Sequence, residues 1–287
     1  MTTTVAPLSH IILEPLVRLA LEEDLGRAGD ITSDSVIPAE ARAKVVMASR
    51  QEGVIAGLDA AEIAFRLVDA TLTVKRLKAE GAEVRPGDEV LEVEGRARSI
   101  LTAERVALNF VGHMSGIATL TNKMVKAVGN HKAKICSTRK TTPGLRAVEK
   151  YAVKVGGGAN HRRGLDDAIL IKDNHIAIAG GIAVALRRAK ENAGHMIKIE
   201  IEVDTLEQLR EVLEEGADVV MLDNMSLEDM ATAVKLAAGR ALVEASGGVT
   251  LERIPKIAAT GVDMISSGAL THSAPNFDVG LDFKAAA

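Results

Sequence analysis

The chain has 287 residues, 47% apolar and 26% charged, which is typical of a soluble globular protein and too apolar for a disordered one. Its formal net charge of −4 gives no overall attraction for nucleic acid or for an anionic membrane. Aromatic residues make up only 2%, too few for a surface that stacks nucleic-acid bases. The length suits one α/β barrel or two domains.

The chain carries one cysteine, Cys136, which excludes an intramolecular disulfide framework and is typical of a reducing compartment. Its first residues, MTTTVAPLSH, lack the basic and apolar regions of a signal peptide. No run of about 18 apolar residues predicts a membrane span. We therefore expect a soluble cytoplasmic protein in which Cys136 is a core thiol.

The first half of the chain shows no repeat. Apolar spacing predicts helices over 11–26, ending at Gly26, and over 58–70. Residues 29–38 (GDITSDSVIP) are expected to form a polar loop, residues 41–53 a strand, and residues 72–95 a strand-rich stretch. A single long or broken helix is expected over 99–129, with Gly112 and Gly116 as the points of interruption.

From residue 130 onward, short β-branched runs alternate with amphipathic helical runs. The predicted strands are 133–140, 168–175, 197–203, 218–224, 241–248 and 262–269. The helical runs at 205–216, 226–239 and 250–261 each begin on an N-capping residue and end on glycine. This cadence predicts an α/β barrel, with an open doubly wound sheet as the second choice.

Polar residues gather at the C-terminal ends of these strands, the edge where both architectures bind ligands. The glycine-bearing ends 246–248 (SGG) and 267–268 (SG) are each followed by a helix start, which favours a phosphate site over ordinary tight turns. Glu202 and Asp223 end neighbouring strands and are candidates to hold Mg²⁺ or to stabilise positive charge, although simple salt bridges are the alternative. Glu200 shares the face of Glu202 and is a second candidate.

Cations concentrate between His131 and Arg163, where nine lysines and arginines stand against one acid, Glu149. A solvated face is the ordinary explanation, but these cations are mixed with Thr, Gly, Pro and Asn. The stretch GGGANHRRGL (156–165) matches neither a P-loop nor a dinucleotide fingerprint. So many cations predict several anionic groups, such as a pyrophosphate plus carboxylates. No His/Cys cluster indicates zinc.

Residues 137–176 (STRKTTPGLRAVEKYAVKVGGGANHRRGLDDAILIKDNHI) closely resemble the signature of the quinolinate phosphoribosyltransferase family, the decarboxylating nicotinate-nucleotide pyrophosphorylases. The resemblance continues through TAERVALNF (102–110), IEVDTLEQL (201–209), LDN (222–224), EASGGV (244–249) and ISSGALTHSAP (265–275), and so covers nearly the whole chain. Ser137 stands where relatives often carry Asp, a departure to which we attach no catalytic role.

The resemblance implies an N-terminal α/β sandwich domain over 1–115 and an incomplete (β/α) barrel of the type II phosphoribosyltransferase class over 116–275. The tail, about 276–287, is a candidate to pack on the first domain. The implied reaction joins quinolinate to phosphoribosyl pyrophosphate with Mg²⁺, giving nicotinate mononucleotide, CO₂ and pyrophosphate in de novo NAD biosynthesis. The implied assembly is a homodimer with shared active sites.

The resemblance also implies residue roles by motif position. Quinolinate or its reacting complex is bound by Thr138, Arg139, His161, Arg162, Lys172 and, from the partner chain, Arg105. The residues expected to act at the phosphoribosyl donor, its ribose and the metal are Lys140, Lys172, Glu202 and Asp223, of which Glu202 and Asp223 hold Mg²⁺ directly or indirectly. The 5′-phosphate is bound by Ser246, Gly247, Gly248, Ser267, Gly268 and Ala269.

Two alternatives stay open. The first is a relative of the same fold with another substrate, such as a nicotinate-using transferase or a molybdenum-transport-associated protein; the set of carboxylate-binding cations favours the dicarboxylate. The second is a non-catalytic binding module, because residues 80–95 (EGAEVRPGDEVLEVEG) are similar to a biotinyl or lipoyl domain. That stretch lacks a lysine in a Met-Lys-Met type of turn, which argues against it.

Overall fold

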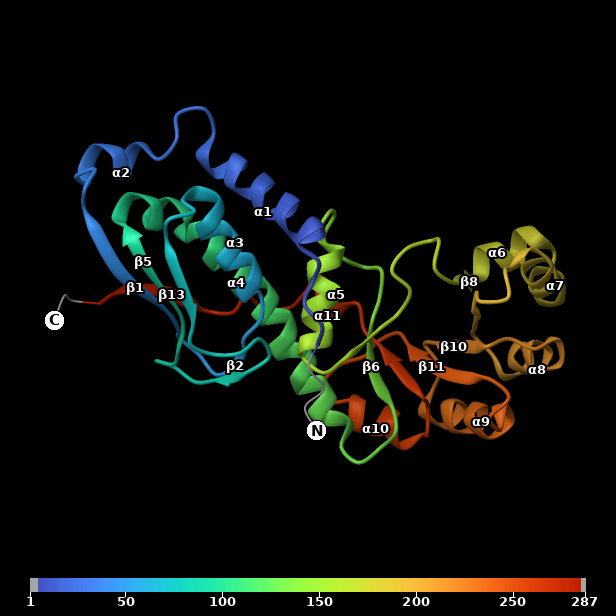
Figure 1. The fold of residues 1–287 in the computed structure, drawn as a ribbon. Coiled ribbons are helices and arrows are strands. Elements are labelled where there is room, and N and C mark those ends of the chain that lie inside the picture. The colour runs from blue at the N-terminus through green and yellow to red at the C-terminus, as the bar shows by residue number, and fades with distance from the viewer. Residues whose placement is uncertain (1–4, 285–287) are drawn as a thin grey trace. The chain divides into compact units, whose positions relative to one another are not determined.

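The computed structural model describes residues 5–284, which form two compact units (Figure 1). The first unit contains residues 5–122, 142–157 and 273–284, and the second contains 123–141 and 158–272. The packing thus interleaves the units along the chain, whereas the predicted boundary lies after residue 115, with only the tail, about 276–287, returning to the first domain. Residues 1–4, in the stretch inspected for a signal peptide, lie outside the described residues. So do residues 285–287, at the end of the expected tail.

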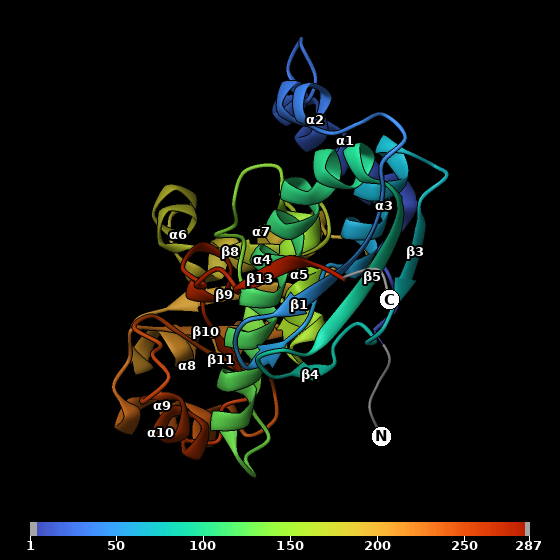
Figure 2. The same cartoon turned by 90° about the vertical axis from the view of Figure 1, so that its left-hand side faces the viewer.

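An antiparallel sheet of order β13-β1-β5-β3 forms the centre of the first unit (Figure 2). Its strands are β1 (Arg42–Ser49), β3 (Thr73–Arg76), β5 (Glu89–Arg96) and β13 (Val279–Phe283). A small ladder joins β2 (Gly53–Val54) to β4 (Glu83–Val84). The helices α1 (His10–Leu25) and α3 (Leu58–Val68) pack on each other, and α1 ends at Gly26 as predicted.

The expected loop at 29–38 is wrong, because α2 (Ile31–Val36) occupies its centre. The Asp30 carboxylate accepts a hydrogen bond from the Ser33 N–H at 2.9 Å and caps the first turn. Six polar or β-branched residues show no helical periodicity, so only the cap could have indicated this helix.

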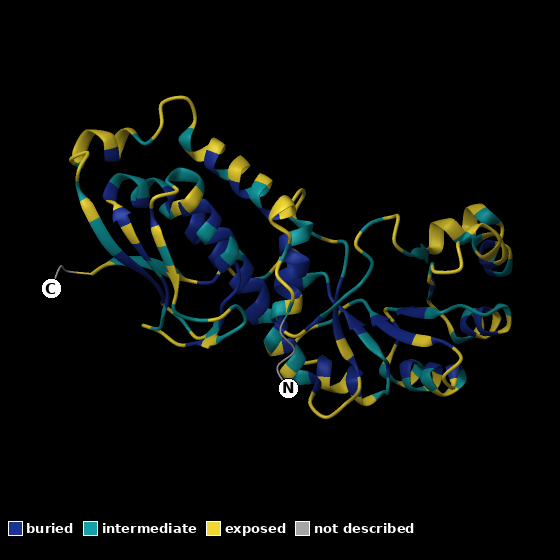
Figure 3. Ribbon diagram, viewed as in Figure 1, coloured by how far each residue is buried: buried dark blue, intermediate teal, exposed yellow. Residues whose placement is uncertain are grey.

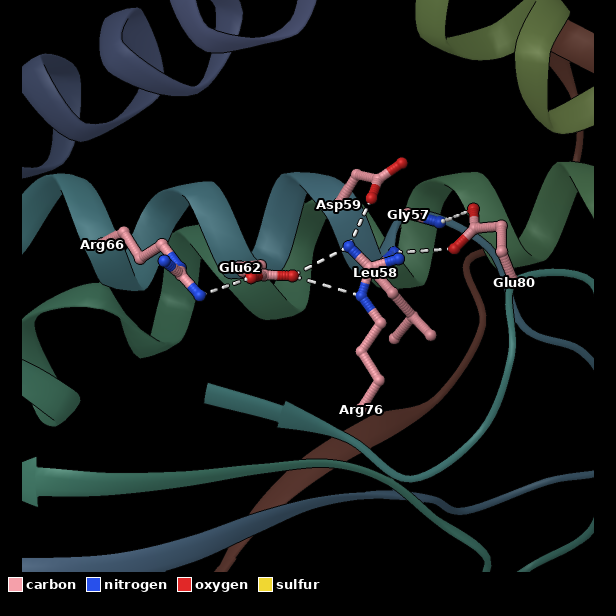
Figure 4. Close-up of polar contacts among 7 residues, drawn as sticks. All are labelled: Gly57, Leu58, Asp59, Glu62, Arg66, Arg76 and Glu80. Carbon is pink, nitrogen blue, oxygen red and sulfur yellow. Dashed lines mark hydrogen bonds and ion pairs between the residues drawn. The ribbon is translucent and has the colours of Figure 1, made fainter. Parts of the chain in front are cut away.

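An acidic side chain holds the beginning of α3 (Figure 4). The Glu80 carboxylate accepts hydrogen bonds from the N–H groups of Gly57 and Leu58, at 2.6 and 3.1 Å. A carboxylate at this position satisfies exposed donors and complements the helix dipole. Along the same helix, Arg76 Nη2 lies 2.8 Å from the Glu62 carboxylate.

The long helix is unbroken. α4 (Ala97–Val128) runs straight through Gly112 and Gly116, so neither glycine interrupts it. A Cβ added to Gly116 would lie 2.1 Å from the Pro275 carbonyl oxygen. The glycines are therefore needed for the close approach of the C-terminal segment and not for a kink.

A helix that the periodicity did not predict, α5 (Arg146–Val155), lies in the first unit. Its C-terminal glycines have two separate uses. A Cβ on Gly156 would lie 2.4 Å from the Ala118 carbonyl oxygen, so this glycine allows α5 to touch α4. Gly157 has φ 90° and turns the chain toward β7, which leads into His161 and Arg162.

Seven parallel strands form the second unit, in the order β7-β6-β12-β11-β10-β9-β8. They are β6 (Lys134–Ser137), β7 (Ala159–Asn160), β8 (Ile169–Ile171), β9 (Ile199–Val203), β10 (Val219–Asp223), β11 (Leu242–Ser246) and β12 (Met264–Ser266). Because β12 pairs with β6, the order is circular with one ladder missing, between β7 and β8. The incomplete barrel is confirmed, and the doubly wound sheet is wrong. We call the missing ladder the seam.

The helices of the second unit are α6 (Asp173–Ala179), α7 (Ile182–Asn192), α8 (Leu206–Glu215), α9 (Leu227–Ala237), α10 (Ile254–Ala259) and α11 (Ala269–His272). Thr205 and Ser226 cap α8 and α9 as predicted. Thr250 does not cap α10, which begins only after Arg253, and α9 ends on Ala238 with φ 46°. The predicted strand 168–175 is wrong beyond Ile171, because residues 173–175 start α6.

Burial follows the strands and the sheet-facing sides of the helices (Figure 3). In β9, Ile199, Ile201 and Val203 alternate with Glu200 and Glu202, so the two acids share one face. Within residues 5–284, no helix combines the length and the apolar character needed to cross a bilayer.

Candidate active site

A pocket of about 560 Å³ lies at the C-terminal ends of the barrel strands. It is lined by Thr138, Arg139, Lys140, His161, Arg162, Leu170, Lys172, Glu202, Met221, Asp223, Asn224, Glu244, Ser246, Gly247, Gly248 and Ser266. Met221 and Asp223 on β10 are two positions apart, as are Glu244 and Ser246 on β11, which is expected for the inward face of a barrel. The predicted strand-end residues from β6 to β11 are thereby brought together.

Cations line the side of the pocket formed by β6, β7 and β8. Arg139 and Lys140 follow β6, and the Lys140 N–H donates to Thr138 Oγ1 at 3.0 Å. Arg139 Nε is buried without a hydrogen-bond partner among the described residues. Burial, and then the neighbouring Arg139, lower the pKa of Arg162. Two partly desolvated guanidiniums that repel each other form a site that an anion would stabilise.

His161 lies between this cationic side and the floor of the pocket. Its Nε2 is 2.6 Å from Glu200 Oε2, and its Nδ1 accepts the Arg162 backbone N–H at 2.8 Å. The Arg162 side chain crosses the seam, where Nη1 donates to the Ala168 carbonyl oxygen at 3.0 Å. Glu200 therefore lies beneath the pocket, against His161, and is not the second carboxylate of the pocket that its position beside Glu202 predicted.

Two carboxylates, Glu202 and Asp223, line the pocket from the neighbouring strands β9 and β10. Lys172 Nζ is 3.6 Å from Glu202 Oε2, an ion pair longer than a hydrogen bond. Burial raises the pKa of Glu202, an effect that Lys172 opposes and Asp223 reinforces. Asn224 Nδ2 donates to Asp223 Oδ2 at 2.8 Å and so orients that carboxylate.

A glycine turn follows β11. Gly247 and Gly248 have φ values of 88° and 57°, a region that favours glycine. A Cβ on Gly247 would lie 2.1 Å from Asn224 Oδ1, so the turn is also packed tightly against the next strand end. The Asn224 N–H donates to the Ser246 carbonyl oxygen at 3.0 Å, which fixes the two loops together.

The strand end after β12 lies outside the pocket lining. Neither Ser267, Gly268 nor Ala269 lines the pocket, and the Ser267 N–H donates to the Cys136 carbonyl oxygen at 3.0 Å. A Cβ on Gly268 would lie 2.9 Å from Lys140 Cδ, so this segment adjoins a pocket lysine. Arg105, the remaining predicted residue, is exposed on α4 in the first unit.

Family models decide the affiliation of the chain. The model of the quinolinate phosphoribosyl transferase N-terminal domain matches residues 30–115, and that of the C-terminal domain matches 117–282. The chain belongs to the quinolinate phosphoribosyltransferase family.

Individual members of this family are similar over nearly their whole length. A probable nicotinate-nucleotide pyrophosphorylase (carboxylating) of Bacillus subtilis is 43% identical, over 96% of this chain and 94% of the relative. A mitochondrial quinolinate phosphoribosyltransferase (decarboxylating) of Nicotiana glauca is 44% identical, over 94% and 81%. The crystal structure of NadC from Streptococcus pyogenes matches with a TM-score of 0.93 at 41% identity, covering 98% of this chain and 100% of that one.

The sequence did not single out Glu244 as a residue of this pocket, whereas Asn224 was expected with Asp223 among the polar strand ends. Glu244 is 1% exposed and faces the barrel interior two positions before Ser246. An acid inside the apolar run ALVEAS was the available signal. Cys136 is buried, as expected of a core thiol. His175 Nδ1 accepts the Lys172 N–H at 2.9 Å at the start of α6.

Proposed function

We propose that this chain transfers the phosphoribosyl group of phosphoribosyl pyrophosphate to quinolinate with decarboxylation. The products are nicotinate mononucleotide, CO₂ and pyrophosphate, and the step belongs to de novo NAD synthesis. One observation carries the proposal: in a chain of this family, a single pocket brings Arg139, Arg162 and Lys172 together with Glu202 and Asp223. The printed names of its relatives, with quinolinate and nicotinate nucleotide in them, agree.

The cationic side is proposed to bind quinolinate. Its two carboxylates would neutralise the pair of guanidiniums, of which Arg162 has a pKa lowered by burial and then by the repulsion of Arg139. Guanidinium forks bind carboxylates in two-point geometry, so Arg139 and Arg162 would also orient the pyridine ring. Thr138 lines the same side. A monocarboxylate such as nicotinate would leave part of this charge unmatched.

The acidic side is proposed to serve the sugar donor. The bond from C1′ to pyrophosphate breaks with its electron pair on the leaving group, and positive charge develops on the ribose. Glu202 and Asp223 would stabilise that charge, while Lys140 and Lys172 would bind the phosphate groups. Ser246, Gly247 and Gly248 would hold the 5′-phosphate, and Ser267, Gly268 and Ala269, beside Lys140, are proposed to complete that site.

Glu202 and Asp223 also fit a magnesium ion. Carboxylate oxygens are the ligands that Mg²⁺ prefers, and Glu202 Oε2 is buried without a hydrogen-bond partner in the described part of the chain. When bound, Mg²⁺ would neutralise the charge of the pyrophosphate group. This chain's contribution is to present both carboxylates to one pocket from the neighbouring strands β9 and β10.

The reaction itself needs no covalent protein intermediate. The pyridine nitrogen attacks C1′ and becomes quaternary. The bond from C2 to its carboxylate then breaks, CO₂ leaves, and the electron pair stays on C2, where the positive nitrogen stabilises it until a proton arrives. The protein's work is positioning and charge compensation.

We also propose a cytoplasmic homodimer in which Arg105 enters the partner's site. Arg105 is exposed on α4, as such a role requires. The shared active site is what the resemblance to the family implies.

The deciding experiment mixes purified protein with quinolinate, phosphoribosyl pyrophosphate and Mg²⁺. Equimolar nicotinate mononucleotide and CO₂ are expected, and no product at saturating substrates would refute the function. A parallel reaction with nicotinate in place of quinolinate discriminates the nearest alternative, because a nicotinate-using enzyme would give mononucleotide without CO₂.

A further inference from the structure

Two carboxyl groups are buried together beneath His161. Glu200 is 6% exposed and Glu244 is 1% exposed, and one oxygen of each lies within 4.8 Å of the other and of an imidazole nitrogen. Glu244 and His161 line both the main pocket and a second cavity of about 150 Å³ inside the barrel, whereas Glu200 lines only the second cavity. The pair therefore forms part of the floor that separates these cavities.

The hydrogen bonds of His161 determine its tautomer. Because Nδ1 accepts the Arg162 N–H, a neutral ring must carry its proton on Nε2 and donate it to Glu200. The ring then presents a proton, not a lone pair, to the two carboxyl groups. This arrangement argues against a metal ion bound by these three residues, the one group within residues 5–284 with suitable atoms and spacing. It also occupies both ring nitrogens with protein groups.

The same ring is linked to the arginine of the substrate side. Arg162 is bonded through its backbone to His161 and through its guanidinium to Ala168 across the seam. The charge of Glu200 favours the charged form of Arg162, against burial and the repulsion of Arg139. Glu200 thus supports Arg162 in two ways, through the imidazole and through its own charge.

We propose that Glu200, backed by Glu244, is a positioning residue: it locks His161 from below and thereby holds Arg162 for a dicarboxylate. His161 would then act as a brace, without donating a ring N–H to the substrate. That the dicarboxylate is quinolinate rests on the proposed function.

Glu200→Ala and Glu200→Gln test the proposal, with Asp263→Asn as the matched control. Asp263 directly precedes β12 and, outside the pocket lining, its carboxylate accepts the Val243 backbone N–H at 2.9 Å. The alanine variant should raise the KM for quinolinate on the order of tenfold and change the KM for phosphoribosyl pyrophosphate less than about twofold. Glutamine keeps an acceptor for Nε2–H and should restore most of the loss. The control should change neither KM.

Two kinetic outcomes would overturn the proposal: a quinolinate KM unchanged in folded Glu200→Ala, or both KM values rising together. If Glu200→Ala does not fold, Glu200→Gln is compared with wild type. In Glu200→Gln, a small rise confined to the KM for quinolinate supports the proposal. Equal rises in the KM for quinolinate and the KM for phosphoribosyl pyrophosphate refute it.

A spectroscopic measurement separates this proposal from the proposed function. Nitrogen-15 spectra of histidine-labelled wild type should show His161 as the Nε2–H tautomer, assigned by the signal lost in His161→Gln. This form should persist in Glu200→Gln and give way to a tautomer mixture in Glu200→Ala. A wild-type His161 protonated on Nδ1 would contradict the proposal, whatever substrate the enzyme uses. Failure of wild type to convert quinolinate would instead refute only the function.

Discussion

Lys172 and Glu202 face each other from neighbouring strands, with Lys172 Nζ 3.6 Å from Glu202 Oε2. The register explains the pair: Ile171 on β8 is opposite Ile201 on β9, so the next residues stand side by side. Burial raises the pKa of the carboxyl that Lys172 faces. The lysine therefore helps to keep Glu202 ionised where charge is expected to develop.

Removing this charge should slow the reaction without unfolding the chain. We expect Glu202→Gln to lower kcat about a hundredfold or more, the usual effect of losing an electrostatic contact to a transition state. Steady-state kinetics measure the loss, and thermal unfolding tests the fold. Glu207→Gln, on the exposed side of α8, is the control and should retain wild-type kcat. A Glu202→Gln enzyme with unimpaired turnover would exclude the proposed role.

The glycine turn after β11 should tolerate no side chain. Gly247→Ala places a methyl group 2.1 Å from Asn224 Oδ1 at a φ of 88°. We expect a rise on the order of tenfold in the KM for phosphoribosyl pyrophosphate and a loss of about 1–3 kcal/mol in unfolding free energy. Gly239→Ala shares the positive φ, 77°, with no atom within 4 Å, and should show the strain alone. Equal KM values in the two variants would contradict the phosphate assignment.

The long helix should be sensitive at Gly116. An alanine there brings its methyl group to 2.1 Å from the Pro275 carbonyl oxygen, and backbone must move to admit it. Denaturant unfolding should show a loss of at least about 2 kcal/mol. Gly194→Ala, where no atom lies within 4 Å and φ is ordinary, should cost much less. A Gly116→Ala chain as stable as this control would show that the helix and the segment separate easily.

A shared active site predicts complementation. Arg105→Ala and Lys172→Ala homodimers should each be nearly inactive. When the two are unfolded together and refolded, heterodimers should regain activity, because one of their two sites combines the intact Arg105 of one chain with the intact Lys172 of the other. Differently tagged chains confirm mixing. Heterodimers that form and stay inactive would argue that each site is built from a single chain.

Stability should fall as the pH rises toward neutrality, because burial and then the charge of Glu200 raise the pKa of Glu244 from 4.5 to about 7. Between these values the folded chain holds a proton that the unfolded chain has released, so this contribution is fully present below pH 4.5 and is lost by pH 7. Glu244 alone contributes at most about 1.4 kcal/mol per pH unit to the slope.

Denaturant unfolding at several pH values measures that slope. Glu244→Gln should make it shallower without removing it, because burial also raises the pKa of Glu80 to about 7. Glu207→Gln should leave the slope as in wild type. Parallel curves for wild type and Glu244→Gln would place the pH dependence elsewhere.

Local signals in the sequence predicted much of the barrel. Thr205 and Ser226 cap helices where their spacing indicated, and the strand-end residues from Arg139 to Gly248 line one pocket. Capping depends on atoms about three residues apart in the chain, so it can be predicted from a short stretch of sequence. Parallel strands place their C-terminal ends at one edge of the sheet, so the residues that meet there can also be predicted before the fold is known. The predictions for 29–38 and for the start of α10 were wrong, because a capping residue alone does not show whether a helix follows it: Asp30 caps α2, whereas Thr250 caps no helix.

By itself, the sequence determined the family, the barrel class and the chemistry of the strand ends. The tertiary structure decided which charges meet. Glu200 and Glu202 share a face and differ by two positions, yet one supports His161 and the other faces Lys172. Gly116 was expected to interrupt the long helix, but it instead allows the segment at Pro275 to approach the helix closely. Such partners lie tens of residues or more away, and only the packing of the sheet and helices brings them within bonding distance.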